Sequence, residues 1–285
     1  MTNWSELMKG VLSAPYRTWI AQIVAIVRME SRRNLLTWRS LWVYALAFAP
    51  TSIILLHSVV GSGRHSIESD TDVMAGIFHY YYMRLGIFFG TLSIFTRLVR
   101  GEMVERSLHY WLLAPIRREV LLVGKYLAGM VRAIALFWTA ITASFLLMYM
   151  HFGAAGQQFM FDGPGFEHWK AYLLITALAC IAYGSIFLLL SMLLKNPMPA
   201  ALLLMGYEAI SSILPAPLQK LSVIAYLRHL MPVSVPTDGL FALLTVNTEP
   251  VAPWAAVTGV LLLTAVVVAL SAYRMRSLEI SYTPE

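Results

Sequence analysis

The stretch RLVRGEMVERSLHYWLLAPIRREVLLVGKYLAG, residues 97–129, is the longest polar interruption between two strongly apolar segments. Six basic residues lie in it: Arg97, Arg100, Arg106, Arg117, Arg118 and Lys125. Basic residues beside a membrane span are expected on its cytoplasmic side. Residues 102–113 contain neither Gly nor Pro, and Pro115 then interrupts the run. The stretch therefore predicts a short cytoplasmic helix, a proline turn and the start of the next span.

The composition of the whole chain is that of a membrane protein. Of its 285 residues, 59% are hydrophobic and only 13% are charged, and the mean hydropathy is +0.68. A soluble domain of this size needs far more polar surface, so we expect an all-α, polytopic membrane protein. The net charge of +6 comes from arginines beside apolar segments, which favours membrane topology over a nucleic-acid partner. Cys180 is the single cysteine, which excludes a disulfide within the chain and a cysteine-based metal site.

The apolar runs predict six transmembrane helices, each of about the length that the hydrocarbon core requires. They cover approximately residues 41–60, 76–98, 121–150, 171–194, 198–214 and 252–273. Residues 1–40 are expected to form a cytoplasmic start and an amphipathic helix in the inner interface, because apolar residues recur there at helical spacing between arginines. The alternative is a buried or partly spanning helix. Residues 99–120 form the predicted cytoplasmic loop, and residues 274–285 form a cytoplasmic tail.

Residues 215–250, between the fifth and sixth predicted spans, contain five prolines: Pro215, Pro217, Pro232, Pro236 and Pro250. Residues 221–231 are too short and too charged to span. We therefore expect an external, re-entrant segment of short helices that dip into the outer leaflet, where protein or water satisfies the backbone.

The distribution of basic residues sets the orientation. Fifteen of the 21 lysines and arginines fall on the side of the 99–120 loop, four fall on the other side, and Arg84 and Arg132 fall inside spans. Cytoplasmic loops carry the excess of Lys and Arg, so both termini are expected in the cytoplasm.

A set of residues in the 97–129 stretch resembles the cytoplasmic loop of the permease subunits of type-two ABC exporters. The matching residues are Glu102, Glu105, Leu112, Leu113, Pro115, Arg117, Glu119, Leu121, Leu122, Gly124 and Lys125. These permeases usually have Gly-Thr-Leu after the second glutamate, whereas this chain has Arg106-Ser107-Leu108. The span layout extends the resemblance to nearly the whole length. The family also has an amphipathic connecting helix before the first span and a re-entrant segment before the last one.

The resemblance implies an export machine in the plasma (bacterial inner) membrane. Two permease subunits pair, as a homodimer or a heterodimer, and each is served by a separate ATPase subunit that binds ATP and Mg²⁺. Residues 102–114 would form a coupling helix that docks on this ATPase, with charges for orientation and aromatic anchors. The residues expected to couple are Glu102, Glu105, Arg106, His109, Tyr110, Trp111 and Leu112. The alternative is a loop that only obeys the positive-inside rule.

The sequence contains no motif for chemistry of its own. It lacks Gly-x-x-x-x-Gly-Lys-Ser/Thr, so we expect that the chain is not an enzyme and binds no cofactor. It also lacks His-Glu-x-x-His, Gly-x-Ser-x-Gly and carboxylates at metal-ligand spacing, and His109 and His151 are isolated in sequence. The resemblance places the substrate path on the second and fifth spans, with Phe88, Phe89, Met205 and Tyr207 as candidates. Simple packing is the alternative for each.

Three charges lie within or close to the predicted spans: Arg84, Arg132 and Glu208. A charge at the bilayer centre costs about 2.5–3.5 kcal/mol on insertion scales, so each should face protein or water. One hypothesis is that Glu208 pairs with Arg84 or Arg132, and the alternative is that each side chain snorkels. Gly86 and Gly90 form a Gly-x-x-x-Gly pair that permits close helix approach.

Other classes of function stay open. A secondary transporter would couple to ions through buried carboxylates and usually shows repeated halves, and the sequence offers only Glu208 and no repeat. A membrane-embedded enzyme would need converging catalytic groups. A non-transporting assembly subunit is the third alternative. An apolar, aromatic path suits a lipid-like or amphipathic substrate.

Overall fold

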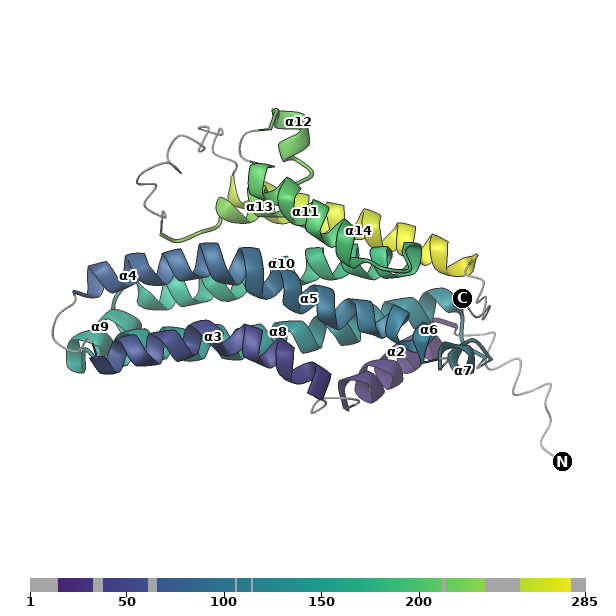
Figure 1. Cartoon of the computed structure of the whole chain (residues 1–285), viewed down its shortest axis with the longest axis horizontal. Coiled ribbons are helices and arrows are strands. Elements are labelled where there is room, and N and C mark those ends of the chain that lie inside the picture. Colours follow the sequence, from purple (N-terminus) through teal and green to yellow (C-terminus); the bar gives the residue numbers. More distant parts are fainter. Residues whose placement is uncertain are drawn as a thin grey trace.

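The computed structural model describes residues 15–32, 38–60, 66–105, 107–113, 115–211, 214–233 and 252–277, and the regular structure in these ranges is helical throughout (Figure 1). The helices form an elongated bundle, with α9 at one end and α7 at the other, hereafter the α9 end and the α7 end. Their bounds are α2 Pro15–Arg32, α3 Trp38–Val60, α4 Ile67–Gly76, η1 Ile77–Gly86, α5 Ile87–Thr96, η2 Arg97–Gly101, α6 Glu102–Val104, α7 Leu108–Leu113, α8 Arg118–Met150, α9 Ala154–Phe161, α10 Gly165–Leu193, α11 Met198–Ile210, α12 Ala216–Gln219, α13 Val223–Arg228 and α14 Pro253–Arg276.

Five helical segments within the described ranges are long and apolar enough to cross a membrane. They are Ser40–Val59, Ile67–Val104, Arg118–Met150, Gly165–Leu193 and Pro253–Arg276. The prediction of a helical, multi-pass membrane protein is confirmed at this level.

The fifth predicted span, 198–214, is a shorter helix in the structure. Helix α11 has 13 residues. At 1.5 Å per residue it extends about 20 Å, which falls short of the hydrocarbon core of about 30 Å. Pro197 directly precedes the helix and Pro199 lies in its first turn, and Ser211 directly follows its last residue. The described residues thus support five spanning helices where the sequence predicted six.

Several helices extend beyond the apolar runs. The predicted second span, 76–98, lies within a continuous helical segment from Ile67 to Val104. This segment begins at a capped turn, where the Ser66 hydroxyl accepts a hydrogen bond from the backbone N–H of Ser69 at 3.1 Å. Two of its stretches, η1 and η2, are π-helical. Between the predicted spans 121–150 and 171–194 the structure forms α9 and the start of α10.

The segment between α11 and α14 is only partly described. It forms two short helices, α12 and α13, and residues 234–251 lie outside the described residues. Helix α13 packs against α10 and α14. The re-entrant course expected for 215–250 therefore stays a prediction.

Helix α2 has apolar residues on two sides. Ile26 is buried against α8, whereas Ile20 and Val24 are each 58% exposed. An exposed apolar face beside membrane spans suits a helix that lies in the lipid interface.

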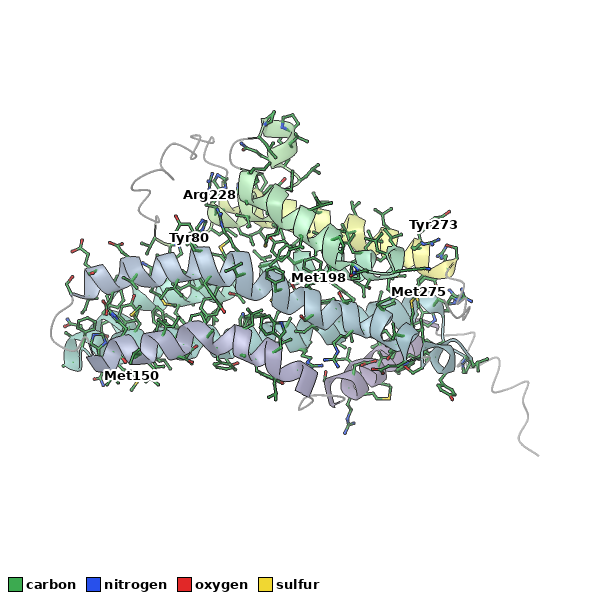
Figure 2. All side chains as sticks on the ribbon, viewed as in Figure 1. Tyr80, Met150, Met198, Arg228, Tyr273 and Met275 are labelled. Atoms are coloured by element: carbon green, nitrogen blue, oxygen red, sulfur yellow. The ribbon has the colours of Figure 1, made fainter. Side chains whose placement is uncertain are left out.

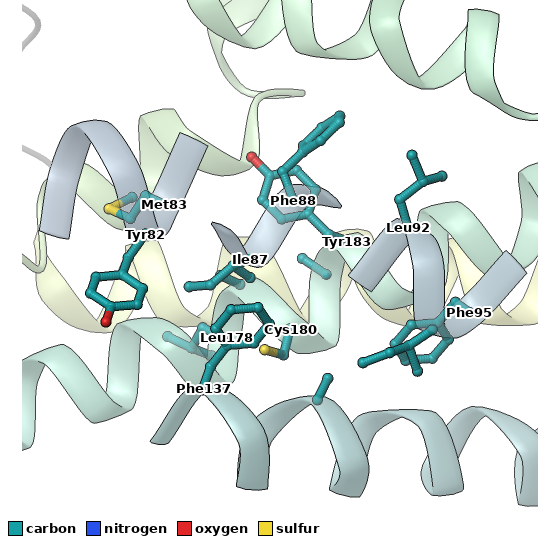
Figure 3. Packing of buried hydrophobic residues seen from close by; sticks show 14 of the residues in the cluster. Tyr82, Met83, Ile87, Phe88, Leu92, Phe95, Phe137, Leu178, Cys180 and Tyr183 are labelled. Atoms are coloured by element: carbon teal, nitrogen blue, oxygen red, sulfur yellow. The ribbon is translucent and has the colours of Figure 1, made fainter. Parts of the chain in front are cut away.

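Phe95 belongs to the buried core (Figure 3), and its ring fits between two glycines. A Cβ atom at Gly184 of α10 would lie 2.4 Å from Phe95 Cζ, and one at Gly129 of α8 would lie 2.7 Å from Phe95 Cε1. The absence of side chains at these glycines therefore allows α5, α8 and α10 to meet around one aromatic ring.

The expected close approach at the Gly-x-x-x-Gly pair is confirmed at Gly90. A Cβ atom there would lie 2.5 Å from Cζ of Phe137 on α8. At Gly86 the nearest such contact is an ordinary 3.5 Å, to Tyr81.

A buried carboxylate ties three helices together at the α9 end. Asp70 of α4 is fully buried, and its two oxygens lie 3.4 Å from His57 Nε2 and 3.6 Å from His151 Nε2. His57 belongs to α3, and His151 directly follows α8. His151, isolated in the sequence, therefore has an ionisable partner in the fold.

The glycine slot around Phe95 gives a stability prediction. Gly184→Ala should lower the free energy of unfolding by about 1–3 kcal/mol, because overpacking forces a buried ring to move. Thermal unfolding of the purified protein in detergent measures this change. Gly206→Ala is the control, because no atom lies within 4 Å of its added Cβ. Equal stability of the two variants would contradict the prediction.

Candidate functional site

The side chain of Lys125 is buried between two carboxylates at the α7 end. Lys125 lies on α8 and has no exposed surface. Its Nζ donates to Glu30 Oε1 of α2 at 2.9 Å and lies 2.8 Å from Glu102 Oε2 of α6. Both glutamates are also buried. One ammonium group thus connects α2, α6 and α8.

Close packing of α2 on α8 places Glu30 beside this lysine. A Cβ atom at Gly124 would lie 2.9 Å from Ile26 Cδ1, so the glycine lets α2 approach. Glu30 follows Ile26 by four residues and therefore lies on the same face of α2. Gly124 thus allows α2 to approach α8, and the neighbouring Lys125 provides the charge that pairs with Glu30.

Helix α7 attaches to the same lysine through an aromatic ring. Nζ of Lys125 lies 4.9 Å from the centroid of the Trp111 ring, a cation–π distance. Leu108, three residues earlier on α7, is fully buried. We call Lys125, Glu30, Glu102 and Trp111 the Lys125 cluster.

The electrostatics of the cluster hold its members together. Removing one partner of a buried ion pair leaves an uncompensated charge, which costs about 3–5 kcal/mol. Separation of α2 or α6 from α8 would create such a charge. A displacement of α6 and α7 is therefore expected to move α8 and α2 with it.

Two cavities adjoin the cluster. The smaller one, of about 60 Å³, is lined by Glu30 and Glu102 together with Arg97, Glu105 and Arg132. The larger one, of about 420 Å³, is mainly apolar and lies between α3, α5 and α8. The two share Ser40, Val43, Ile94 and Arg132.

The predicted coupling helix over 102–114 is broken in the structure. Helices α6 and α7 are separated by a turn in which the backbone N–H of Ser107 donates to the carbonyl of Glu102 at 2.9 Å. The break allows Glu102 and Trp111 to reach the same lysine, which corrects the expectation of one continuous helix.

The residues predicted to couple fall into two groups. Glu102 is buried and Trp111 is partly buried, and both contact Lys125. Glu105 and Tyr110 are exposed, as a docking residue must be. Arg106 and the side chains of His109 and Leu112 lie outside the described residues.

Sequence reasoning missed several residues of this site. Glu30 was not singled out, although it is the only carboxylate within an apolar helical pattern that includes Ile26. Lys125 was named only as a basic residue of the 97–129 stretch and as part of the resemblance. Val104 and Leu113, which are 70% and 80% exposed, were not selected as docking residues. The position of Lys125 within the predicted span 121–150 was the available signal, because a charge inside a span needs a partner.

Glu208 contacts α13 rather than the arginines that the sequence suggested. Its carboxylate accepts hydrogen bonds from the Ser222 hydroxyl at 2.5 Å, the Val223 N–H at 2.9 Å and the Ile224 N–H at 3.2 Å. The hypothesis of a pair with Arg84 or Arg132 gives way to a carboxylate that holds the start of a short helix.

The two arginines lie elsewhere. The guanidinium carbon of Arg84 is 5.8 Å from the ring centroid of Tyr80. Arg132 lines both cavities beside the Lys125 cluster.

The four candidates for a substrate path are spread over the fold. Phe88 is 1% exposed and packs edge-on against Tyr183 and Phe187, with ring centroids 5.2 and 4.9 Å apart (Figure 3). Phe89 and Met205 are partly buried against the core. The Tyr207 hydroxyl donates to the carbonyl of Leu218. This environment assigns Phe88 to core packing.

No group of three His, Cys, Asp or Glu side chains in the described ranges could hold a metal ion. No protein-family model matches the chain, and no curated protein matches it significantly.

The Lys125 cluster gives a prediction about local order. Lys125→Met should accelerate hydrogen exchange in α2 and α6, because two buried carboxylates lose their counter-charge. The triple variant Lys125→Met/Glu30→Gln/Glu102→Gln should recover most of the protection, because no unpaired charge remains. Unchanged exchange in the single variant would rule out the structural role of the cluster.

Glu208 gives a second prediction about order. Glu208→Ala should accelerate exchange in 222–228, because three donors lose their acceptor. Glu208→Gln retains an acceptor oxygen and should have a smaller effect. Equal protection in all three proteins would show that the carboxylate does not hold α13.

Proposed function

We propose that this chain is the permease subunit of an ATP-driven exporter, which moves its substrate across the plasma membrane and is powered by a separate ATPase subunit. The observation that carries the proposal is the Lys125 cluster. It joins an amphipathic helix, two short helices and a spanning helix through one buried charge, at the end of the bundle where basic residues concentrate.

The exposed surface of α6 and α7 supports docking of a soluble partner at this end. Val104, Tyr110 and Leu113 are 70%, 70% and 80% exposed. Large side chains exposed together at the end of a spanning segment and on the short helix that follows it are typical of interaction sites. An ATPase that binds ATP and Mg²⁺ is the partner that the resemblance implies.

The mechanism follows from how α7 is attached. A partner that closes on ATP pushes α7, whose inner side carries Leu108 and Trp111. Trp111 lies on Lys125, which in turn holds Glu102 and Glu30. The push therefore reaches α8 and α2 together, and the spanning helices tilt as a group. A second permease subunit, identical or related, completes the path.

The orientation belongs to the same proposal. The α7 end faces the cytoplasm because it carries the excess of lysine and arginine, and both termini lie on that side. The membrane is the plasma membrane, which is the inner membrane of a bacterial cell with two membranes.

An ion-coupled secondary transporter is the rival with an identifiable residue, Glu208. Its carboxylate oxygens already accept three hydrogen bonds from the start of α13. This arrangement favours a structural role over reversible ion binding. A non-transporting assembly subunit would lack an ATPase partner.

The test is co-purification from native membranes. The tagged chain, solubilised in mild detergent, should retain a protein with a Gly-x-x-x-x-Gly-Lys-Ser/Thr motif, identified by mass spectrometry. Tyr110→Ala/Leu113→Ala should retain about ten-fold less of it, since two exposed anchors are removed. Phe161→Ala on α9 is the control, because Phe161 is 71% exposed at the opposite end.

Two outcomes would contradict the proposal. One is that wild-type protein retains no such ATPase under conditions that preserve other ABC complexes. The other is that the double variant and Phe161→Ala retain it equally, which would place docking elsewhere.

A further inference from the structure

An apolar groove lies between three spanning segments of the bundle. It has a volume of about 420 Å³ and is lined by α3, α5 and α8, together with the end of α2. Val43, Phe48 and Leu136 give it mainly apolar walls. Val131 is 48% exposed and Ala135 is also exposed, so the groove opens on the outer surface of α8. Since these segments are apolar enough to span a membrane, acyl chains of the bilayer surround this opening.

The depth of the groove matches one leaflet. On α3 its walls run from Ser40, where the spanning segment begins, to Phe48, and on α8 they run from Val131 to Thr139. Each stretch advances about 12 Å at 1.5 Å per residue, and one half of the hydrocarbon core is about 15 Å. Figure 2 shows Met150, the last residue of α8, at the α9 end. The groove therefore begins at the membrane boundary on the α7 side and ends within that leaflet.

A polar cavity of about 60 Å³ continues the groove at this boundary. The two share Ser40 and Arg132 among their wall residues, and the polar cavity extends along η2 and α6 to Glu30 and Glu102 of the Lys125 cluster. A cavity needs about 10–15 Å³ for each water molecule, so this one has room for about four to six waters or for a small polar group.

The charged groups around the polar cavity balance each other. Its walls and the lysine behind them contain three carboxylates and three basic groups: Glu30, Glu102, Glu105, Arg97, Arg132 and Lys125. Their formal charges sum to zero. Such walls offer hydrogen-bond donors and acceptors to a ligand but require no net charge from it. A small head with both charges fits, whereas a head with a net charge would lose its hydration without gaining a counter-charge.

The joined cavities match the two parts of a phospholipid. The groove accepts an acyl chain, and the polar cavity lies beside its inner end, at the level of the lipid heads. An apolar groove without a ligand loses dispersion contacts along its walls. Close packing, rather than transfer from water, is what stabilises contacts inside a membrane. The bilayer supplies such chains at high local concentration.

We propose that this pair of cavities binds one phospholipid of the leaflet on the α7 side, with one acyl chain in the groove between α3, α5 and α8 and a small zwitterionic head in the polar cavity beside the Lys125 cluster. The site does not depend on whether the chain exports a substrate, and its test needs no ATPase.

The experiment measures lipid binding to the purified full-length chain in a neutral steroid-based detergent, whose rigid tail does not resemble an acyl chain. Native mass spectrometry counts bound copies of palmitoyl-oleoyl-phosphatidylethanolamine as the lipid is titrated. Wild type should bind one copy about ten-fold more tightly than any further copy, a factor that corresponds to about 1.4 kcal/mol. Glycerophosphoethanolamine, which is the head without chains, should not displace this tight copy.

Matched variants separate binding from folding. Ala135→Phe and Val131→Phe each place a ring in the groove from an exposed position and should abolish the tight copy. Ala265→Phe is the control, because Ala265 is exposed on the spanning helix α14 and lines neither cavity. Thermal unfolding shows whether each variant keeps its fold. If one groove variant unfolds, the other still tests the site.

Two further measurements test where the head lies. Phosphatidylglycerol with the same chains should displace the tight copy about ten-fold less effectively than phosphatidylethanolamine, because its head carries a net charge. Saturation with phosphatidylethanolamine should slow hydrogen exchange in α2 and α6, which carry Glu30 and Glu102.

Several results would overturn the proposal. One is equal binding of phosphatidylethanolamine by wild type and a folded Ala135→Phe protein, and another is an equal loss in Ala265→Phe. Displacement of the tight copy by glycerophosphoethanolamine would show that the groove contributes nothing. Tighter binding of phosphatidylglycerol, or unchanged exchange in α2 and α6, would overturn the placement of a zwitterionic head in the polar cavity.

Discussion

The ammonium group of Lys125 carries a full charge with no access to solvent. Its desolvation is tolerable only because Glu30 and Glu102 lie within 2.9 Å and the Trp111 ring covers another side. Each partner belongs to a different element, so the interaction fixes how α2, α6 and α7 sit on α8. Helices as short as α6 and α7 have little stability of their own. The arrangement of the α7 end therefore depends on this one buried charge.

Between the polar clusters, close packing of aromatic rings against glycines holds the helices together. Phe95 occupies the space left by Gly129 and Gly184, and Phe137 occupies the space left by Gly90. Close packing of this kind is the main stabilising interaction among helices in a membrane, where lipid is as apolar as the side chains. Buried charges appear mainly at the ends, at Lys125 and Asp70, where they connect short elements that apolar packing alone cannot fix.

One helical segment, Ile67–Val104, runs from the buried Asp70 to Glu102 of the Lys125 cluster. It carries Arg84 within η1 and Glu102 just after η2, and both π-helical stretches thus lie at residues with buried or clustered charge. A continuous helix transmits rotation or translation along its axis. The buried carboxylates of Asp70 and Glu102, near the two ends of this segment, are therefore mechanically connected.

The sequence by itself determined the membrane class, three of the six expected spans nearly to their ends and the helical nature of 15–32, because hydropathy and periodicity are local properties. It also located the polar loop and the close approach at Gly90. It could not show that α11 is short, that Glu102 and Trp111 point inward to Lys125, or that Glu208 holds α13. These facts depend on contacts between residues far apart in the chain. Only the tertiary structure decides which buried charge finds which partner, because the cost of desolvation is set by all the surrounding helices together.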